Sequence, residues 1–304
     1  MINLALAVAC SVAIGMIFKH TGPQDIDRTG LLTVNYAAAV GVAGLLIWGG
    51  GREMASGLGL SGPLLVLAGG VGALLIAGFY LLSYATDVAG MSLAVGVMRV
   101  SVVIPFLASW GVWGEVPSPA QGAGMALAGV AFFLIARKHR EPAPVPAGAP
   151  GPSPSAAAST VDWHAFGILA LTFCSGGAVD VSMKAFEEGF GAANSRVLFL
   201  LLAFGVAFLI GAGIVAVRGL RTGRWPTRRA VGWGLLLGVV NYGSLEFILR
   251  AIADLPGPFV FPANNIAIMV LSTALGVYGW GERLSRANQV GIALAVLALV
   301  LLRL

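Results

Sequence analysis

The sequence predicts an all-α membrane protein of ten transmembrane helices, arranged as two inverted repeats of five helices each. Three observations support this fold class: an apolar composition, ten apolar stretches of spanning length, and a match between the two halves of the chain. Hydrophobic residues occupy 58% of the 304 positions and charged residues only 10%. Because a soluble domain carries about 25% charged residues, most of this chain must be surrounded by lipid.

Ten stretches of the chain are apolar and approach or exceed the length of about 20 residues that a spanning helix needs. The first could be mistaken for a signal peptide, but no basic segment precedes it, so a first membrane span explains it better. In chain order, the stretches cover residues 2–19, 31–49, 62–85, 90–113, 119–136, 164–186, 195–217, 230–252, 257–281 and 286–303.

A polar segment divides these stretches into two sets of five. Residues 137–141 are basic or acidic, and Pro, Ala, Gly and Ser dominate from there to Thr160. Such a composition buries little apolar surface and forms a flexible or polyproline-like tether. We therefore expect a first five-helix repeat over 1–136, a linker over 137–161 and a second five-helix repeat over 162–304.

The two halves match each other in one ungapped register, offset by 167 residues. This shift aligns the Trp-Gly-Glu tripeptide at 113–115 with the same tripeptide at 280–282, and Asp87 with Asp254. Because five is an odd number, the second copy must enter the membrane in the opposite orientation. Inverted repeats of this kind are the architecture of secondary transporters, whose substrate site lies at the repeat interface near the bilayer midplane.

The end of each half resembles a known module. The Gly-Glu dipeptide, a short polar turn and a glycine-containing last helix are similar to the EamA-type module of the drug/metabolite transporter superfamily. The ninth stretch, with Pro262, Asn264 and Asn265, resembles the ten-helix members, although Pro262 has no counterpart in the first half, where Pro105 lies deeper. The resemblance covers the chain outside the linker and implies a transporter that works without ATP hydrolysis. It leaves the substrate open, since that superfamily moves amino acids, other metabolites, sugars and drugs.

Arg99 is the most informative ionisable residue, because it lies near the middle of the fourth apolar stretch. A charge at a helix centre costs at least about 2.5–3.5 kcal/mol, and no acidic residue lies one helical turn away. Arg99 is therefore either an anchor for a carboxylate or other anion in a cavity, or the partner of an acid on another helix.

Two acid–base pairs lie four residues apart within single helices. Asp180 precedes Lys184, and Glu246 precedes Arg250. This spacing places both groups on one helix face, where they can neutralise each other, while the basic ends extend towards the membrane surface. The alternative for Asp180 and Glu246 is proton coupling, because desolvation disfavours the charged form of a carboxyl.

Other polar residues in the second half are candidates for a substrate cavity. Pro262 frees a backbone carbonyl, and Asn264 and Asn265 offer donors and acceptors that lipid could not satisfy. Asn241 and Tyr242 could join them, although hydrogen bonding between helices would also explain this pair. The residues that both halves share are expected to be structural, with the two glutamates capping helix–helix turns: Trp113, Trp280, Glu115 and Glu282.

No motif of an enzyme, a metal site or a nucleic-acid surface accompanies these residues. Cys10 and Cys174 both lie in apolar stretches and indicate neither a disulfide framework nor a metal site. We therefore expect a multi-pass protein of the cell's inner membrane, without cofactor, that moves a small polar metabolite or drug-like solute by alternating access. Proton coupling is one way to drive it. The alternative is a non-transporting scaffold, sensor or accessory subunit of the same fold.

Basic residues gather in every second loop. Twelve of the 18 lysines and arginines follow the first, fifth, seventh and ninth stretches, against five in the other loops and ends. The positive-inside rule then places the linker in the cytoplasm and both termini outside. This orientation is opposite to the one usually drawn for ten-helix members of the family.

Overall fold

The structure, a computed structural model, describes residues 1–22, 24, 26–50, 59–89, 91–136, 163–281 and 286–304. Eleven helices and no β-strand occur within these residues, so the prediction of an all-α protein is confirmed. The helices are α1 (Ile2–Thr21), α2 (Arg28–Gly49), α4 (Gly62–Ala89), α5 (Met91–Val100), α6 (Val103–Gly111), α7 (Pro119–Ala136), α8 (Trp163–Phe190), α9 (Arg196–Thr222), α10 (Arg228–Asp254), α11 (Gly257–Trp280) and α12 (Arg286–Arg303).

Eight of the helices in the described part of the chain are long and apolar enough to cross a bilayer: α1, α2, α4 and α8 to α12. The shortest of them has 18 residues, which corresponds to about 27 Å of helix against a hydrocarbon core of about 30 Å. Two further apolar helical segments, 96–111 and 119–134, are shorter. The protein is therefore a multi-pass membrane protein.

The fourth predicted helix is not continuous but is broken into α5 and α6 at Ser101. Pro105 has no N–H to donate to the carbonyl of Ser101, four residues earlier. This carbonyl instead accepts from the N–H of Ile104 at 2.9 Å, a tighter bond over three residues. The Ser101 hydroxyl donates to the carbonyl of Met98 at 2.6 Å. The prediction of one continuous helix over 90–113 is therefore wrong, and proline is the reason.

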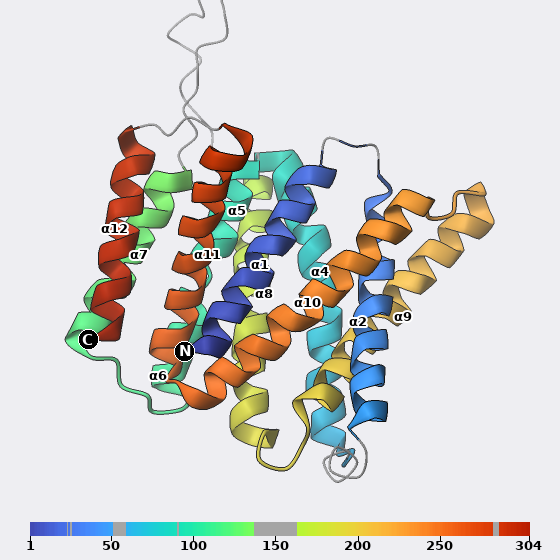
Figure 1. Ribbon diagram of the computed structural model, residues 1–304, viewed down its shortest axis with the longest axis horizontal. Coiled ribbons are helices and arrows are strands. Elements are labelled where there is room, and N and C mark those ends of the chain that lie inside the picture. Colours follow the sequence, from blue (N-terminus) through green and yellow to red (C-terminus); the bar gives the residue numbers. More distant parts are fainter. Residues whose placement is uncertain (23, 25, 51–58, 90, 137–162, 282–285) are drawn as a thin grey trace, which may run out of the picture.

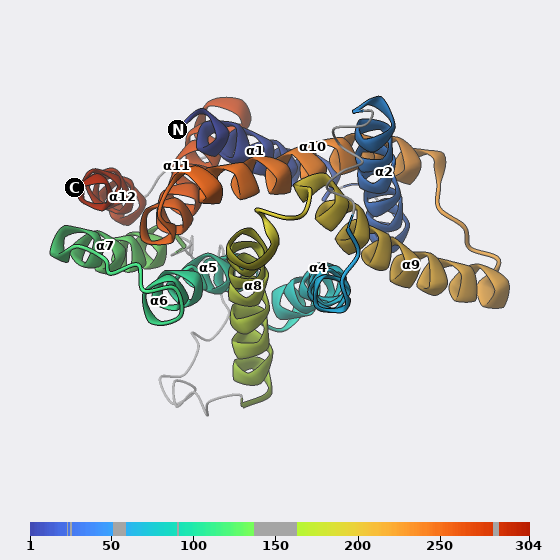
Figure 2. The ribbon, with the colours of Figure 1, turned by 90° about the horizontal axis from the view of Figure 1, so that it is seen from below.

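Both termini lie towards the same face of the helix bundle, and α7 ends at the opposite face (Figure 1). Helices α7 and α12 lie side by side and run in opposite directions (Figures 1 and 2). The start of α7 contacts the end of α12, where Gln121 Nε2 donates to the Leu302 carbonyl at 3.3 Å. A side chain added at Gly124 would meet Ala298 and Leu302, so glycine at this position allows the two helices to approach closely.

The core of the bundle lies between α2, α4, α8, α9 and α10. Phe186 of α8 stacks on Phe199 of α9 with ring centroids 4.1 Å apart. Gly234 and Gly238 of α10 lie against the backbone carbonyls of Leu31 and Asn35 in α2. In lipid no hydrophobic effect drives helices together. Small residues at such contacts let the two backbones approach closely, so van der Waals packing can hold them together.

Asp27 ties the start of α2 to the end of α9 at the face opposite the termini. Its two carboxylate oxygens accept hydrogen bonds from the two terminal nitrogens of Arg218, with 2.7 Å between Nη1 and Oδ1. These hydrogen bonds from the Arg218 guanidinium hold the pKa of Asp27 below its usual value, against the opposing effect of burial. The carboxylate is thus stabilised in its charged form.

We expect Asp27→Asn to lower the free energy of unfolding at pH 7 by about 1–2 kcal/mol, because hydrogen bonds to a charged group are worth about 1.5–3 kcal/mol and this pair is partly exposed. A carboxyl with a lowered pKa contributes stability above its unfolded pKa, and the contribution is lost as the pH falls through the folded pKa. The gap between wild type and variant should therefore shrink below pH 3.8, the ordinary pKa of the group. Denaturant unfolding in detergent at a series of pH values measures it, and a gap that widens on acidification would contradict the prediction.

Candidate functional site

Arg99 lies in the last turn of α5, directly before the helix break. Its Nη1 donates a hydrogen bond to Oδ1 of Asn265 on α11, at 3.2 Å. Two residues predicted to share a site are therefore in contact, although 166 positions separate them. Figure 2 shows the helices that carry them, α5 and α11, on one side of α8.

Asp180 of α8 is the acidic residue whose charge acts on Arg99. No nitrogen–oxygen distance between the two side chains falls within the 4.0 Å of an ion pair. Both residues are only partly exposed. Arg99 thus faces an acid on another helix without being directly paired to it.

The α11 segment around Pro262 remains helical, and proline removes only the N–H that would have bonded the carbonyl of Pro258. The amide nitrogen of Asn265 donates to the Phe261 carbonyl at 3.1 Å, which orients its oxygen for Arg99. The neighbouring Oδ1 of Asn264 is buried and accepts no hydrogen bond within the described residues. A buried acceptor without a donor costs about 1–3 kcal/mol, so this oxygen is suited to a ligand or a water molecule.

Asn241 and Tyr242 of α10 have different surroundings. Asn241 Nδ2 donates to Oδ1 of the buried Asn35 in α2 at 3.2 Å, which favours the interhelical explanation for this residue. Tyr242 packs near Phe204 with ring centroids 6.3 Å apart, and its hydroxyl has no hydrogen-bond partner in the described structure. The structure therefore separates a pair that the sequence treats as one feature.

Glu246 is paired with Arg250 as the spacing predicts, with 2.7 Å between Oε1 and the arginine Nε. Its second oxygen, Oε2, is buried and lacks a partner among the residues described. Arg250 is half exposed, and the acid is nearly buried. One turn earlier on α10, the buried hydroxyl of Tyr242 lies close enough to the Glu246 carboxylate to interact with it, but without the geometry of a hydrogen bond.

Lys184 does not behave as predicted. It neither pairs with Asp180 nor extends to the membrane surface, because its side chain is only 1% exposed. Its Nζ donates to Oε1 of Glu115 at 2.6 Å and to Oε1 of Glu188 at 2.7 Å. The second oxygen of Glu115 accepts the N–H of Gly257, the first residue of α11, at 2.8 Å. We call these four residues, Lys184, Glu115, Glu188 and Gly257, the Lys184 cluster.

The contacts of Glu115 extend beyond its own turn. It caps the start of α11 and neutralises a lysine of α8, so it links three elements that are distant in sequence. A carboxylate near a helix N-terminus is favourable because the helix dipole is positive there. The matching Glu282 lies outside the described residues, as does the side chain of Trp280, whereas Trp113 is half buried beside the turn.

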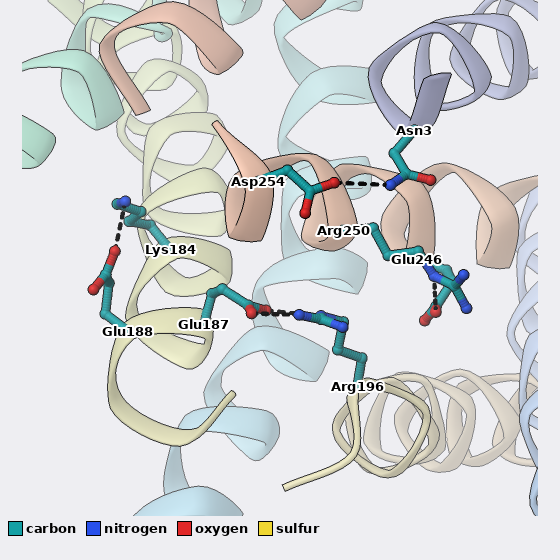
Figure 3. A network of polar contacts seen from close by, with 8 residues as sticks. All are labelled: Asn3, Lys184, Glu187, Glu188, Arg196, Glu246, Arg250 and Asp254. Atoms are coloured by element: carbon teal, nitrogen blue, oxygen red, sulfur yellow. Dashed lines mark hydrogen bonds and ion pairs between the residues drawn. The ribbon is translucent and has the colours of Figure 1, made fainter. Parts of the chain in front are cut away.

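Figure 3 shows the Lys184–Glu188 pair together with other polar contacts of α1, α8, α9 and α10. Glu187 accepts two hydrogen bonds from Arg196 at the start of α9, 2.9 Å from Nε and 2.5 Å from Nη2. Asn3 of α1 donates to Asp254 at the end of α10, at 3.2 Å. Within the described ranges, no three His, Cys, Asp or Glu side chains come together as a metal site would need.

Comparisons with known proteins support the fold. No protein-family model matches the chain. An uncharacterized protein of Haemophilus influenzae is 25% identical over 305 residues, which cover 98% of this chain and 96% of that protein. A crystal structure of a protein with 16% sequence identity has a TM-score of 0.68, covering 99% of this chain and 94% of its own. The whole helix arrangement therefore has an experimental counterpart.

Proposed function

We propose that the protein is a secondary transporter of a small polar metabolite or drug-like solute, of the EamA type, with its substrate site around Arg99. The observation that carries this proposal is the helix break at Ser101, next to an arginine that has no direct ionic partner among the described residues. Secondary transporters bind substrate at discontinuous helices near the midplane. Irregular backbone at membrane depth is tolerated only where it is buried in protein or lines a water-filled space.

In this proposal Arg99 holds a carboxylate or another anionic group of the substrate, because guanidinium binds such groups through two parallel hydrogen bonds. The unpaired Oδ1 of Asn264 accepts from a substrate donor. Asp180 acts electrostatically on Arg99 without pairing with it. In this proposal it takes up or releases a proton when substrate binds to or leaves Arg99. Asn265 positions the arginine.

We also propose that residues 1–136 and 162–304 form two inverted repeats. Shifting Arg99 by the repeat offset of 167 gives position 266, one residue from its observed partner Asn265. A pseudo-two-fold axis brings equivalent positions of the two repeats close together, so a contact of this kind is expected beside the axis. The antiparallel contact of α7 with α12, the last helices of the two halves, is equally consistent with such an axis.

The Lys184 cluster then closes the terminus side of the site. It joins Glu115 of the first half to Lys184 and Gly257 of the second. Gly257 precedes Asn265 by eight residues of α11, or about 12 Å along the helix. When one side of a transporter opens, the contacts that join its two repeats on that side must break. Opening on the terminus side would therefore disrupt the Lys184 cluster.

Comparing metabolites inside and outside cells that lack or overproduce the protein tests the function. We expect one class of small polar solute to change its distribution in opposite directions in the two strains. Overproduction of Arg99→Ala at an equal membrane level serves as the control and should behave like the deletion. If no solute differs between the strains, a scaffold, sensor or accessory subunit becomes the better explanation.

The loop charges predict the orientation of the protein in the membrane. A reporter that is active only in the cytoplasm should be active when inserted in the 141–160 linker and silent when fused after Leu304. Five arginines between 218 and 229 follow the seventh apolar stretch and carry most of this expectation. The reverse pattern of reporter activity would contradict it and favour the orientation usually drawn for ten-helix members.

A further inference from the structure

The structure has a groove on the outer surface of α10, in its first two turns. Arg229, Gly232, Trp233 and Leu236 line it. This end of α10 lies at the face opposite the chain termini (Figure 1). The indole of Trp233 also contacts His20 at the end of α1, with ring centroids 5.1 Å apart. We infer that this groove binds an anionic phospholipid, with the phosphate at Arg229 and an acyl chain along Gly232 and Leu236.

The positive charge around the groove is not neutralised by nearby carboxylates of the described residues. Five arginines lie between the end of α9 and the start of α10, and among the described residues only the first of them, Arg218, has an acidic partner. The other four have no carboxylate partner within the described structure: Arg221, Arg224, Arg228 and Arg229. Clustered basic residues at a membrane surface attract anionic lipid by about 1 kcal/mol each. This attraction is diffuse, so it explains a preference for anionic headgroups but not a particular place.

The groove defines where the phospholipid binds, because its lining changes from polar at Arg229 to apolar at Leu236 along the helix. Arg229 and Leu236 are seven residues apart, or about 10 Å along α10, which is the step from the headgroup region into the acyl region. Apart from the adjacent residues and backbone of α10 itself, nothing lies within 4 Å of the position that a Cβ at Gly232 would occupy, so an acyl chain can lie against the backbone there. Tryptophan prefers the headgroup level, and guanidinium matches a phosphate in geometry.

An anionic phospholipid fits this lining better than a soluble phosphate does, since most of the groove is apolar. Native mass spectrometry of the full chain in detergent, titrated with phosphatidylglycerol, measures retained lipid. Arg229→Gln should weaken binding about tenfold, and Gly232→Leu should weaken it similarly by filling the groove without changing charge. Arg303→Gln removes an exposed arginine at the end of α12 and should leave binding unchanged.

Four results would overturn the inference. They are equal binding of phosphatidylcholine, equal weakening by Arg303→Gln, no effect of Gly232→Leu, and full competition by glycerol phosphate. The last result would mean a soluble phosphate site, and the second would mean diffuse attraction without a site. The thermal midpoint of each variant without added lipid should equal that of the wild type, which shows that a loss of binding does not reflect a loss of folding.

Discussion

Lys184→Met is expected to lower the free energy of unfolding by about 3–5 kcal/mol, the largest change we expect for a single substitution. The side chain of Lys184 is 1% exposed, and it neutralises both Glu115 and Glu188. Removing one partner of a buried ion pair leaves an uncompensated charge, which costs about 3–5 kcal/mol. At about 2 °C or more per kcal/mol, the thermal midpoint in detergent should fall by roughly 6–10 °C.

The two carboxylates of the Lys184 cluster provide an internal comparison. Glu115 is 25% exposed and also holds the N–H of Gly257, whereas Glu188 is 43% exposed and holds only the lysine. Glu115→Gln should therefore cost more stability than Glu188→Gln. Combining Lys184→Met with Glu115→Gln should recover part of the loss, because the unpaired charge disappears. A Lys184→Met protein with a wild-type midpoint would show that the cluster contributes little.

Arg99→Lys is expected to reduce transport at least tenfold at an equal amount of protein in the membrane. Lysine keeps the charge but loses the planar pair of donors that binds a carboxylate and also reaches Asn265. A hydrogen bond to a charged group is worth about 1.5–3 kcal/mol, and 1.4 kcal/mol is a factor of ten. Uptake or efflux of the solute found by metabolite comparison, per folded molecule, is the measurement.

Asn264→Ala and Asn265→Ala extend this test to α11. Both should lower transport while the membrane yield stays near normal, Asn264 through its unpaired oxygen and Asn265 through the position of Arg99. Arg303→Lys at the exposed end of α12 is the matched control and should transport as the wild type does. If the three site variants insert poorly but transport normally per folded molecule, these residues are packing elements and the site assignment fails.

The spanning helices could be predicted from the sequence because lipid demands a property that is local in the chain. Apolar length alone located the long helices to within a few residues, for example 164–186 against Trp163–Phe190. The division of the fourth helix was missed because hydropathy does not register the loss of one N–H at Pro105. That proline in an apolar stretch was the available signal, and it points to the carbonyl of Ser101 four residues earlier.

The candidate site was predicted in part. Arg99 and Asn265 stood out because polar groups are costly in a membrane, and the repeat offset would have brought them within one position of each other. Of the two partners of Lys184, Glu188 lies at the same four-residue spacing as Asp180 and was overlooked, whereas Glu115 could not be found in this way. Glu115 lies 69 residues away in a turn, and the nearer candidate, Asp180, satisfied the familiar four-residue spacing. Local charge spacing could not decide between Asp180 and Glu188, and the fold adds a third acid, Glu115, from a distant turn.

The capping of α11 by Glu115 affects how much of the protein is open, and how much is closed, on the terminus side in the proposed cycle. Opening the terminus side would expose a lysine and uncap a helix at the same time, since one carboxylate serves both. A difference of a few kcal/mol keeps the minor state at about 0.1–10% of the molecules. An empty transporter would then rest almost entirely closed on this side. Substrate can shift that equilibrium only by its differential affinity for the two states, so tight binding alone would not speed the cycle.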